Sequence, residues 1–363
     1  MLAALVMVGC TSAKKTDNGL VPPGAEFRTG LPFEPGYAQQ FGYAHRWARS
    51  IKLGDGQSVF AVEIVDDLII TVERPTNIIT ALNLKDGSLA WKSLIGEPLE
   101  NFFGPVGDDE YIYVSSNRRM FKLLRRNGQT DGVYELPLPV TMTPLLVDNI
   151  AVFGSVNGKV YGFDVEEGYR KWTYGLSGRI NSTPLLDGED VFVVDADGRY
   201  VMITANSGAV QWRGSTFGDI SADPVLVGRE IYLASEDQSL YSFAANTGEL
   251  RWPAYRSEVA LTQTPAVRND VIFLPEPTLG LTAIDADTGK SIWQTTDVVQ
   301  PVASVGGKVI AFADKKLKKI EPATGEVLQT VPTREIQMIL NGPGNSLILV
   351  TPGGEIMRID PRR

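Results

Sequence analysis

A repeat of about 40 residues runs through most of the chain, and it limits the possible folds more than any other feature. Turn glycines mark it at intervals of 41, 40, 40, 40, 41 and 36 residues: Gly87, Gly128, Gly168, Gly208, Gly248, Gly289 and Gly325. A tryptophan stands four residues after five of these glycines: Trp91, Trp172, Trp212, Trp252 and Trp293. A proline opens each repeat: Pro105, Pro144, Pro184, Pro224, Pro265, Pro301 and Pro343. These three marks at one period indicate a fold that stacks one supersecondary unit many times.

Each repeat has the pattern of short β-strands. In residues 144–174, four apolar or alternating runs are separated by turn sequences such as Asp148-Asn149 and Asn157-Gly158. No amphipathic stretch of helical length lies between these runs. Four strands in about 40 residues, repeated around an axis, are typical of a β-propeller blade.

The two ends of the repeat region predict how the ring closes. Seven blades fit between residue 58 and about residue 335, and residues 346–360 supply only part of an eighth blade. Residues 45–51 read like residues 89–95, with Trp47 in the place of Trp91. We therefore predict an all-β, eight-bladed propeller of four-stranded antiparallel blades, forming one domain over residues 43–363. An N-terminal strand would complete the last blade and remove its open edge.

The N-terminal residues are typical of an exported protein. Residues 1–8 are apolar but too few to span a bilayer, so residues 1–9 are interpreted as a partial signal peptide. The sequence Met7-Val8-Gly9-Cys10 resembles a bacterial lipobox, which predicts lipidation of Cys10; the alternative is a free cysteine in a frayed terminus. Thr11 after the cysteine favours the outer membrane. The proline-punctuated residues 10–42 are predicted to be a flexible tether, with aromatic residues that can lie on the domain surface.

Composition and charge exclude several classes of function. The net charge of −9 disfavours nucleic-acid binding through a phosphate-neutralising surface. One cysteine and one histidine exclude a disulfide framework and poly-histidine metal centres. His45 lies beside Trp47 and is interpreted as a packing residue. The segment Asp195-Ala196-Asp197-Gly198 resembles part of a calcium loop, but its register favours a hairpin turn. We predict no catalytic and no metal-binding residues.

Several charged runs fall in expected turns. The acidic runs 66–67 and 108–110 are predicted to be solvated turns between the first two strands of their blades. The basic runs 118–119, 125–126 and 315–319 are candidates for a common rim that contacts acidic partners or lipid headgroups. The alternative is that they form a plain solvated edge.

The segment from Ala283 to Trp293 resembles the tryptophan-docking motif of pyrroloquinoline quinone (PQQ) propellers, A-x-D-x-x-T-G-x-x-x-W. Residues 244–252 and 82–91 are looser copies, and the resemblance covers about residues 43–360. It implies the eight-bladed PQQ-like propeller family, in which the tryptophan packs between blades and the glycine permits a tight turn. Trp47 and the five repeat tryptophans are therefore expected to be structural rather than cofactor contacts.

Two branches of this family share the repeats. Quinoprotein alcohol dehydrogenases place a pair of adjacent cysteines beside PQQ, with a Ca²⁺ ion and an aspartate base. The non-enzymatic branch includes BamB-like lipoproteins of the outer-membrane β-barrel assembly machinery. Because Cys10 is the only cysteine, the sequence favours the second branch, with no enzymatic activity and no PQQ.

The resemblance to the second branch implies an envelope scaffold that mediates protein–protein interactions. Its expected partners are the β-barrel assembly machinery and its clients, and its expected place is the periplasmic face of the outer membrane. There it would be lipid-anchored and monomeric within a larger complex, without nucleic acid. The alternatives are a sensor or ligand-binding PQQ-like propeller, or a relative of the quinoprotein dehydrogenases.

Overall fold

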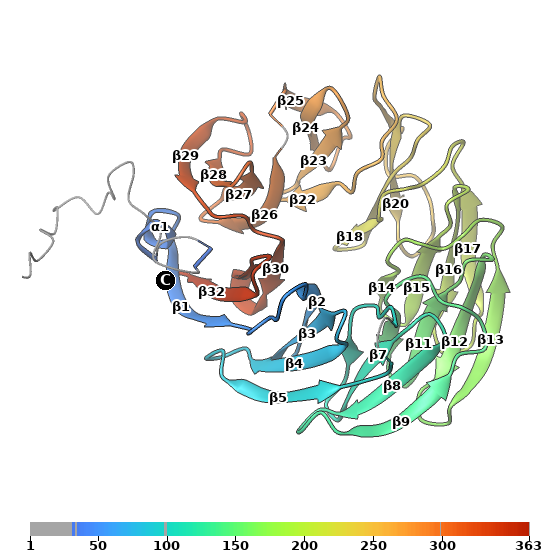
Figure 1. The fold of residues 1–363 in the computed structure, drawn as a ribbon. Coiled ribbons are helices and arrows are strands. Elements are labelled where there is room, and N and C mark those ends of the chain that lie inside the picture. Colours follow the sequence, from blue (N-terminus) through green and yellow to red (C-terminus); the bar gives the residue numbers. More distant parts are fainter. Residues whose placement is uncertain (1–30, 33–34, 98–99, 298, 363) are drawn as a thin grey trace, which may run out of the picture.

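The computed structural model describes residues 31–32, 35–97, 100–297 and 299–362. In these ranges the strands form eight four-stranded antiparallel sheets, arranged as blades around a ring (Figure 1). The predicted all-β, eight-bladed propeller is therefore confirmed.

Each of blades 1–7 is a continuous stretch of chain whose four strands follow one another outward from the axis. Blade 1 contains β2 (Ser58–Val65), β3 (Leu68–Arg74), β4 (Ile78–Asn83) and β5 (Leu89–Leu94), and blade 2 contains β6 (Val106–Gly107), β7 (Tyr111–Ser115), β8 (Arg119–Leu124) and β9 (Thr130–Glu135). Blade 3 contains β10 (Leu145–Val147), β11 (Ile150–Gly154), β12 (Lys159–Asp164) and β13 (Tyr169–Gly175), and blade 4 contains β14 (Leu185–Asp187), β15 (Asp190–Val194), β16 (Arg199–Thr204) and β17 (Val210–Ser215). Blade 5 contains β18 (Val225–Val227), β19 (Glu230–Ala234), β20 (Ser239–Ala244) and β21 (Tyr255–Arg256), and blade 6 contains β22 (Ala266–Arg268), β23 (Val271–Glu276), β24 (Gly280–Asp285) and β25 (Ser291–Thr295). Blade 7 contains β26 (Gln300–Val305), β27 (Lys308–Ala313), β28 (Lys316–Ile320) and β29 (Val327–Pro332).

Blade 8 joins the two ends of the propeller. Its inner strands come from the C-terminal part of the chain: β30 (Met338–Gly342), a 3₁₀ turn η1 (Pro343–Asn345), β31 (Ser346–Val350) and β32 (Glu355–Pro361). Its outermost strand is β1 (Tyr43–Ser50), which pairs antiparallel with β32 and lies beside it in Figure 1. The predicted closure by the N-terminal strand is confirmed.

The hydrophobic core is divided among the spaces between neighbouring blades. One cluster, for example, joins Val152 and Val160 of blade 3 to Val191 and Val193 of blade 4. The second strand of a blade is covered on both faces, so all five residues of β11 are buried. This explains why the middle strands are continuous apolar runs, whereas the outer strands alternate in exposure.

The described end of the predicted tether forms a short helix. The helix α1 (Pro35–Gln40) precedes β1, and Ala38 and Phe41 are buried against blades 7 and 8. Residues 35–42 are thus part of the packed structure rather than a free arm. The predicted signal peptide and Cys10 lie outside the described residues.

Within the described residues, no helix is long and apolar enough to cross a membrane.

Candidate functional site

The six tryptophans of the chain link neighbouring blades at six of the eight junctions in the ring. Each indole Nε1 donates a hydrogen bond to a backbone carbonyl oxygen of the following blade. The pairs are Trp47 to Leu84 at 3.0 Å, Trp91 to Arg125 at 2.7 Å, Trp172 to Ala205 at 2.6 Å, Trp212 to Ala245 at 2.8 Å, Trp252 to Ala286 at 2.9 Å and Trp293 to Pro322 at 2.8 Å. These indoles are therefore engaged in contacts between blades.

A turn glycine of the receiving blade lies against each indole ring. At Gly208, φ is +73°, and an added Cβ would lie 2.7 Å from the ring of Trp172. The same approach to a tryptophan recurs at Gly87, Gly128, Gly248, Gly289 and Gly325. The position needs glycine for two reasons, a left-handed backbone conformation and the lack of room for a side chain.

The junction between blades 2 and 3 uses a tyrosine that the sequence analysis missed. The second repeat has Gly132 at the tryptophan position, but the ring of Tyr134 lies against Gly168. The Tyr134 hydroxyl donates to the carbonyl oxygen of Val165 at 3.2 Å, so this junction keeps the same kind of contact. The signal was an aromatic residue two positions past the expected one.

The helix α1 fills the junction between blades 7 and 8. The seventh repeat has Gln329 at the tryptophan position, and its Nε2 donates to Oε1 of Gln40 at 3.0 Å. Phe41 packs in the same hydrophobic cluster as Leu317 of blade 7 and Leu347 of blade 8. An element from the N-terminal segment thus takes the place of the missing tryptophan.

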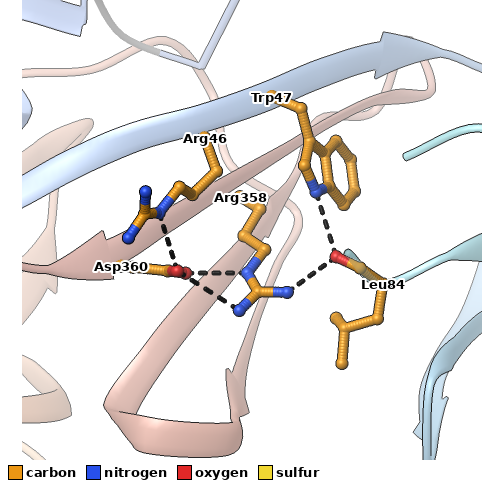
Figure 2. A network of polar contacts seen from close by, with 5 residues as sticks. All are labelled: Arg46, Trp47, Leu84, Arg358 and Asp360. Carbon is orange, nitrogen blue, oxygen red and sulfur yellow. Dashed lines mark hydrogen bonds and ion pairs between the residues drawn. The ribbon is translucent and has the colours of Figure 1, made fainter. Parts of the chain in front are cut away.

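The closing blade carries an additional polar network (Figure 2). The carbonyl oxygen of Leu84 accepts hydrogen bonds from Trp47 Nε1 at 3.0 Å and from Arg358 Nη1 at 2.7 Å. The Asp360 carboxylate pairs with Arg358 at 2.7 Å and with Arg46 at 2.8 Å. The network ties β1 and β32 to blade 1, across the point where the ring closes.

The loops of the propeller form two rims. The loop rim consists of the hairpins between the second and third strands and the loops that join successive blades; the turn rim consists of the other turns. On the loop rim, Arg118 precedes β8 and Arg119 is its first residue. On the turn rim, Arg125 and Arg126 follow the last residue of β8. The hypothesis of one common basic rim is therefore wrong, because a whole strand separates the two arginine pairs.

On the turn rim, one cleft lies between blades 1 and 2 and another between blades 2 and 3. The first, of about 590 Å³, is lined by Asp67, Asp109 and Arg125, and the second, of about 460 Å³, by Asp109, Tyr111 and Glu166, among others. The predicted acidic turns are present, and they surround Arg125, which pairs with Asp66 at 3.2 Å, with Asp67 and with Asp109 at 3.9 Å. These turns therefore link blades 1 and 2 by ion pairs.

The loop rim presents a strongly exposed aromatic side chain. Phe217, in the loop between β17 and β18, has 91% of its surface exposed. Its amide donates at 3.0 Å to Oδ2 of Asp237, which also accepts from the Tyr241 hydroxyl at 2.6 Å. The loop is thus fixed to the neighbouring hairpin while its phenyl ring projects into solvent.

The segment 195–198 forms the hairpin between β15 and β16, as its register predicts. The buried carboxylate of Asp195 accepts from the amides of Ser177 at 3.0 Å, Gly178 at 2.8 Å and Arg199 at 2.8 Å. Its oxygens are therefore used to hold the adjoining loop. Within the described ranges, no three His, Cys, Asp or Glu side chains are grouped so that they could hold a metal ion.

Desolvation also shifts the pKa values of His45 and Glu63. Burial lowers the pKa of His45, whose Nε2 has no hydrogen-bond partner among the described residues. Desolvation of its carboxyl raises the pKa of Glu63, on β2, to about 7, although the residue as a whole is exposed. Its Oε1 lies close to Gly104, where an added Cβ would be 3.3 Å away.

A family model described as "Outer membrane protein assembly factor BamB" matches residues 75–213 and 175–363. This chain belongs to the BamB family. No curated protein sequence matches it significantly.

Several solved structures share the BamB-like propeller fold. BamB from Moraxella catarrhalis has a TM-score of 0.68 and 19% identity, over 86% of this chain and 97% of that one. The computationally designed Ika8 protein has a TM-score of 0.67 and 12% identity, over 87% and 99%. A quinohemoprotein alcohol dehydrogenase from Pseudomonas putida HK5 has a TM-score of 0.68 and 13% identity, over 90% and 77%. Since these proteins differ in role, the shared fold does not by itself decide function.

Proposed function

We propose that this BamB-family chain is a non-enzymatic envelope scaffold that takes part in the assembly of outer-membrane β-barrel proteins. The observation that carries the proposal is the match of the assembly-factor family model across residues 75–363. The structure is compatible with a scaffold, because its repeated aromatic residues hold the blades together and its loops remain available on a rigid ring.

We also propose that the protein works without PQQ. The only cysteine is Cys10, so the chain has no pair of adjacent cysteines of the kind found in the dehydrogenase branch. The indole nitrogens are engaged between blades. Equilibrium dialysis of the purified chain against PQQ is expected to show no saturable binding; stoichiometric binding would favour the ligand-binding or dehydrogenase alternative.

The proposed location is the periplasmic face of the outer membrane, with lipidated Cys10 as the anchor and the residues before α1 as the tether. The family membership and the lipobox-like sequence support this proposal. Cys10→Ser is expected to move the protein from the membrane fraction to the soluble periplasmic fraction. An unchanged distribution would contradict lipid anchoring.

We propose that Phe217 belongs to the surface that contacts the assembly machinery. An exposed aromatic side chain on a fixed loop is a favourable anchor for a protein partner, because its ring is desolvated on binding with little loss of backbone freedom. The loop is held by Asp237, so a substitution at Phe217 leaves the supporting hydrogen bonds in place.

The test is affinity purification of the tagged full chain from detergent-solubilised envelopes of its own host after mild crosslinking. Stoichiometric recovery of the central β-barrel assembly subunit is expected. Phe217→Ser is expected to reduce that recovery, whereas Leu94→Ser, at a side chain 71% exposed on β5, is the matched control. Absence of the subunit with intact, lipidated bait would contradict the proposed function.

A further inference from the structure

The gap between blades 3 and 4 contains a cleft of about 410 Å³. Tyr174 and Gly175 at the end of β13 line one side of it, and Arg199, Arg213 and Ser215 of blade 4 line the other. No aspartate or glutamate belongs to the described lining, although the chain as a whole carries a net charge of −9. The cleft is thus a locally basic site in an acidic protein.

The two arginines lie on the same face of blade 4. Arg199 is opposite Ser215 in the pairing of β16 with β17, and Arg213 is opposite Val201, so the two arginines are diagonal neighbours. Residues in this relation are roughly 7–8 Å apart at their bases, so their long side chains can reach each other, and two guanidinium charges at that separation repel. A bound anion would relieve that repulsion.

Both guanidinium groups lack a carboxylate partner in the described part of the chain. No ion pair is formed there by Arg199 or Arg213. Arg213 Nη1 makes a long hydrogen bond of 3.4 Å to the Tyr174 hydroxyl, which holds the side chain toward the cleft. Most of the donor capacity of the two arginines therefore remains for a ligand.

Blade 2 has an arginine at the position equivalent to Arg199, and there the protein itself supplies the carboxylate partner. Arg119, the first residue of β8, corresponds to Arg199, the first residue of β16, two repeats later. Arg119 holds both oxygens of the Glu100 carboxylate, with Nε at 3.1 Å from Oε1 and Nη2 bonded to Oε2. The same place in the blade is thus built to present an arginine fork to a planar carboxylate.

We propose that the cleft between blades 3 and 4 binds an acidic side chain of an extended polypeptide, with Arg199 and Arg213 holding its carboxylate. Leu176, which also lines the cleft, provides apolar surface for the residues on either side of that carboxylate. This assigns a ligand chemistry to a defined site and does not depend on the proposed envelope role.

The test measures binding of fluorescein-labelled hexaglutamate to the purified full chain by fluorescence anisotropy at low salt. Saturable binding is expected, with none for hexaglutamine. Arg199→Gln/Arg213→Gln is expected to weaken binding by about ten- to hundredfold, the loss of charge-assisted hydrogen bonds. Arg170→Gln/Arg229→Gln removes the same charge at exposed positions and is expected to leave the affinity unchanged.

A second variant tests the site without removing its arginines. Ser215→Glu places a carboxylate opposite Arg199, as Glu135 lies opposite Arg119 in blade 2. It is expected to abolish hexaglutamate binding and to raise Tm. Equal weakening by both arginine pairs, or undiminished binding by Ser215→Glu, would overturn the proposal. Stronger displacement of the probe by inorganic phosphate than by glutarate would also overturn it. The assay uses the chain alone, so its failure leaves the envelope function to its own test.

Discussion

Gly208 and Trp172 show how one residue pair can set the spacing between two blades. The glycine adopts φ of +73° in the turn of blade 4, and the indole of blade 3 occupies the space that a side chain would need. The indole nitrogen then reaches the Ala205 carbonyl at 2.6 Å. Packing and hydrogen bonding are satisfied together only at one separation of the blades.

Replacement of this glycine is expected to cost more than backbone strain. Gly208→Ala forces a left-handed alanine and also a Cβ contact 2.7 Å from the indole. Gly188→Ala is the matched control, since Gly188 has φ of +66° and nothing within 4 Å of an added Cβ. The control is expected to lose about 1–2 kcal/mol from strain, and Gly208→Ala about 1–3 kcal/mol more from overpacking. Urea denaturation measures both; equal losses would contradict the steric account.

Glu63 is expected to make stability depend on pH. Its pKa rises from 4.5 to about 7 on folding, so between these values the folded state binds more protons than the unfolded state. Stability from this group therefore falls as pH rises from 4.5 to 7 and is constant above that range. Glu63→Gln is expected to raise Tm at pH 8 and to leave it unchanged at pH 4. A Tm difference independent of pH would contradict this assignment.

At the scale of elements, the strands were predictable and the helix was not. The strands repeat their turn glycines and apolar runs seven times, so the resemblance of residues 45–51 to residues 89–95 was enough to place β1 in blade 8. The helix α1 has six residues and occurs once, without a periodic pattern. Its position depends on the missing tryptophan at Gln329 and on the shape of the space left there.

The candidate surfaces were less predictable for a similar reason. Phe217 and the arginines of the cleft are ordinary residues in the repeat, and their importance depends on which neighbouring strands they face. The sequence does show that Arg119 and Arg199 share a repeat position. It does not show that Glu100 reaches Arg119. Nor does it show that the cleft beside Arg199 has no carboxylate in its lining.

The contact of α1 with blades 7 and 8 is expected to contribute strongly to stability. Phe41 is 2% exposed, and Phe41→Ala is expected to lower the free energy of unfolding by about 3–5 kcal/mol. Leu328→Ala, at a side chain 45% exposed on β29, is expected to change it by less than about 0.5 kcal/mol. Thermal denaturation compares the two; similar Tm values would mean that the helix is dispensable for packing.

For the whole molecule, closure of the ring joins residues that are far apart in sequence. Leu84 and Arg358 are separated by 274 residues, and Arg46 and Asp360 by 314. Within blades 1–7, by contrast, paired strands follow one another directly in the sequence. Because long loops are entropically costly to close, we expect the network of Figure 2 to form late in folding.

This order can be tested by kinetics. Arg358→Leu removes the bonds to Leu84 and Asp360 and is expected to raise the unfolding rate about tenfold while the folding rate stays nearly constant. Arg251→Leu is the control: it breaks only the ion pair with Glu230, and the Arg251 side chain is 53% exposed. It is expected to change neither the folding nor the unfolding rate appreciably. Stopped-flow folding in urea measures both, and a slower folding rate for Arg358→Leu would place closure early.

The N-terminal strand β1 and the C-terminal strand β32 lie in the same blade, so the helix α1, which precedes β1, lies at blade 8 (Figure 1). In a ring of eight, blade 4 is diametrically opposite. Phe217 follows the last strand of that blade, and Arg199 and Arg213 lie on its other side, facing blade 3. If the propeller is attached through its N-terminal segment, it rotates about blade 8. The surfaces at blade 4 are then farthest from the attachment point and undergo the largest displacement of any part of the ring.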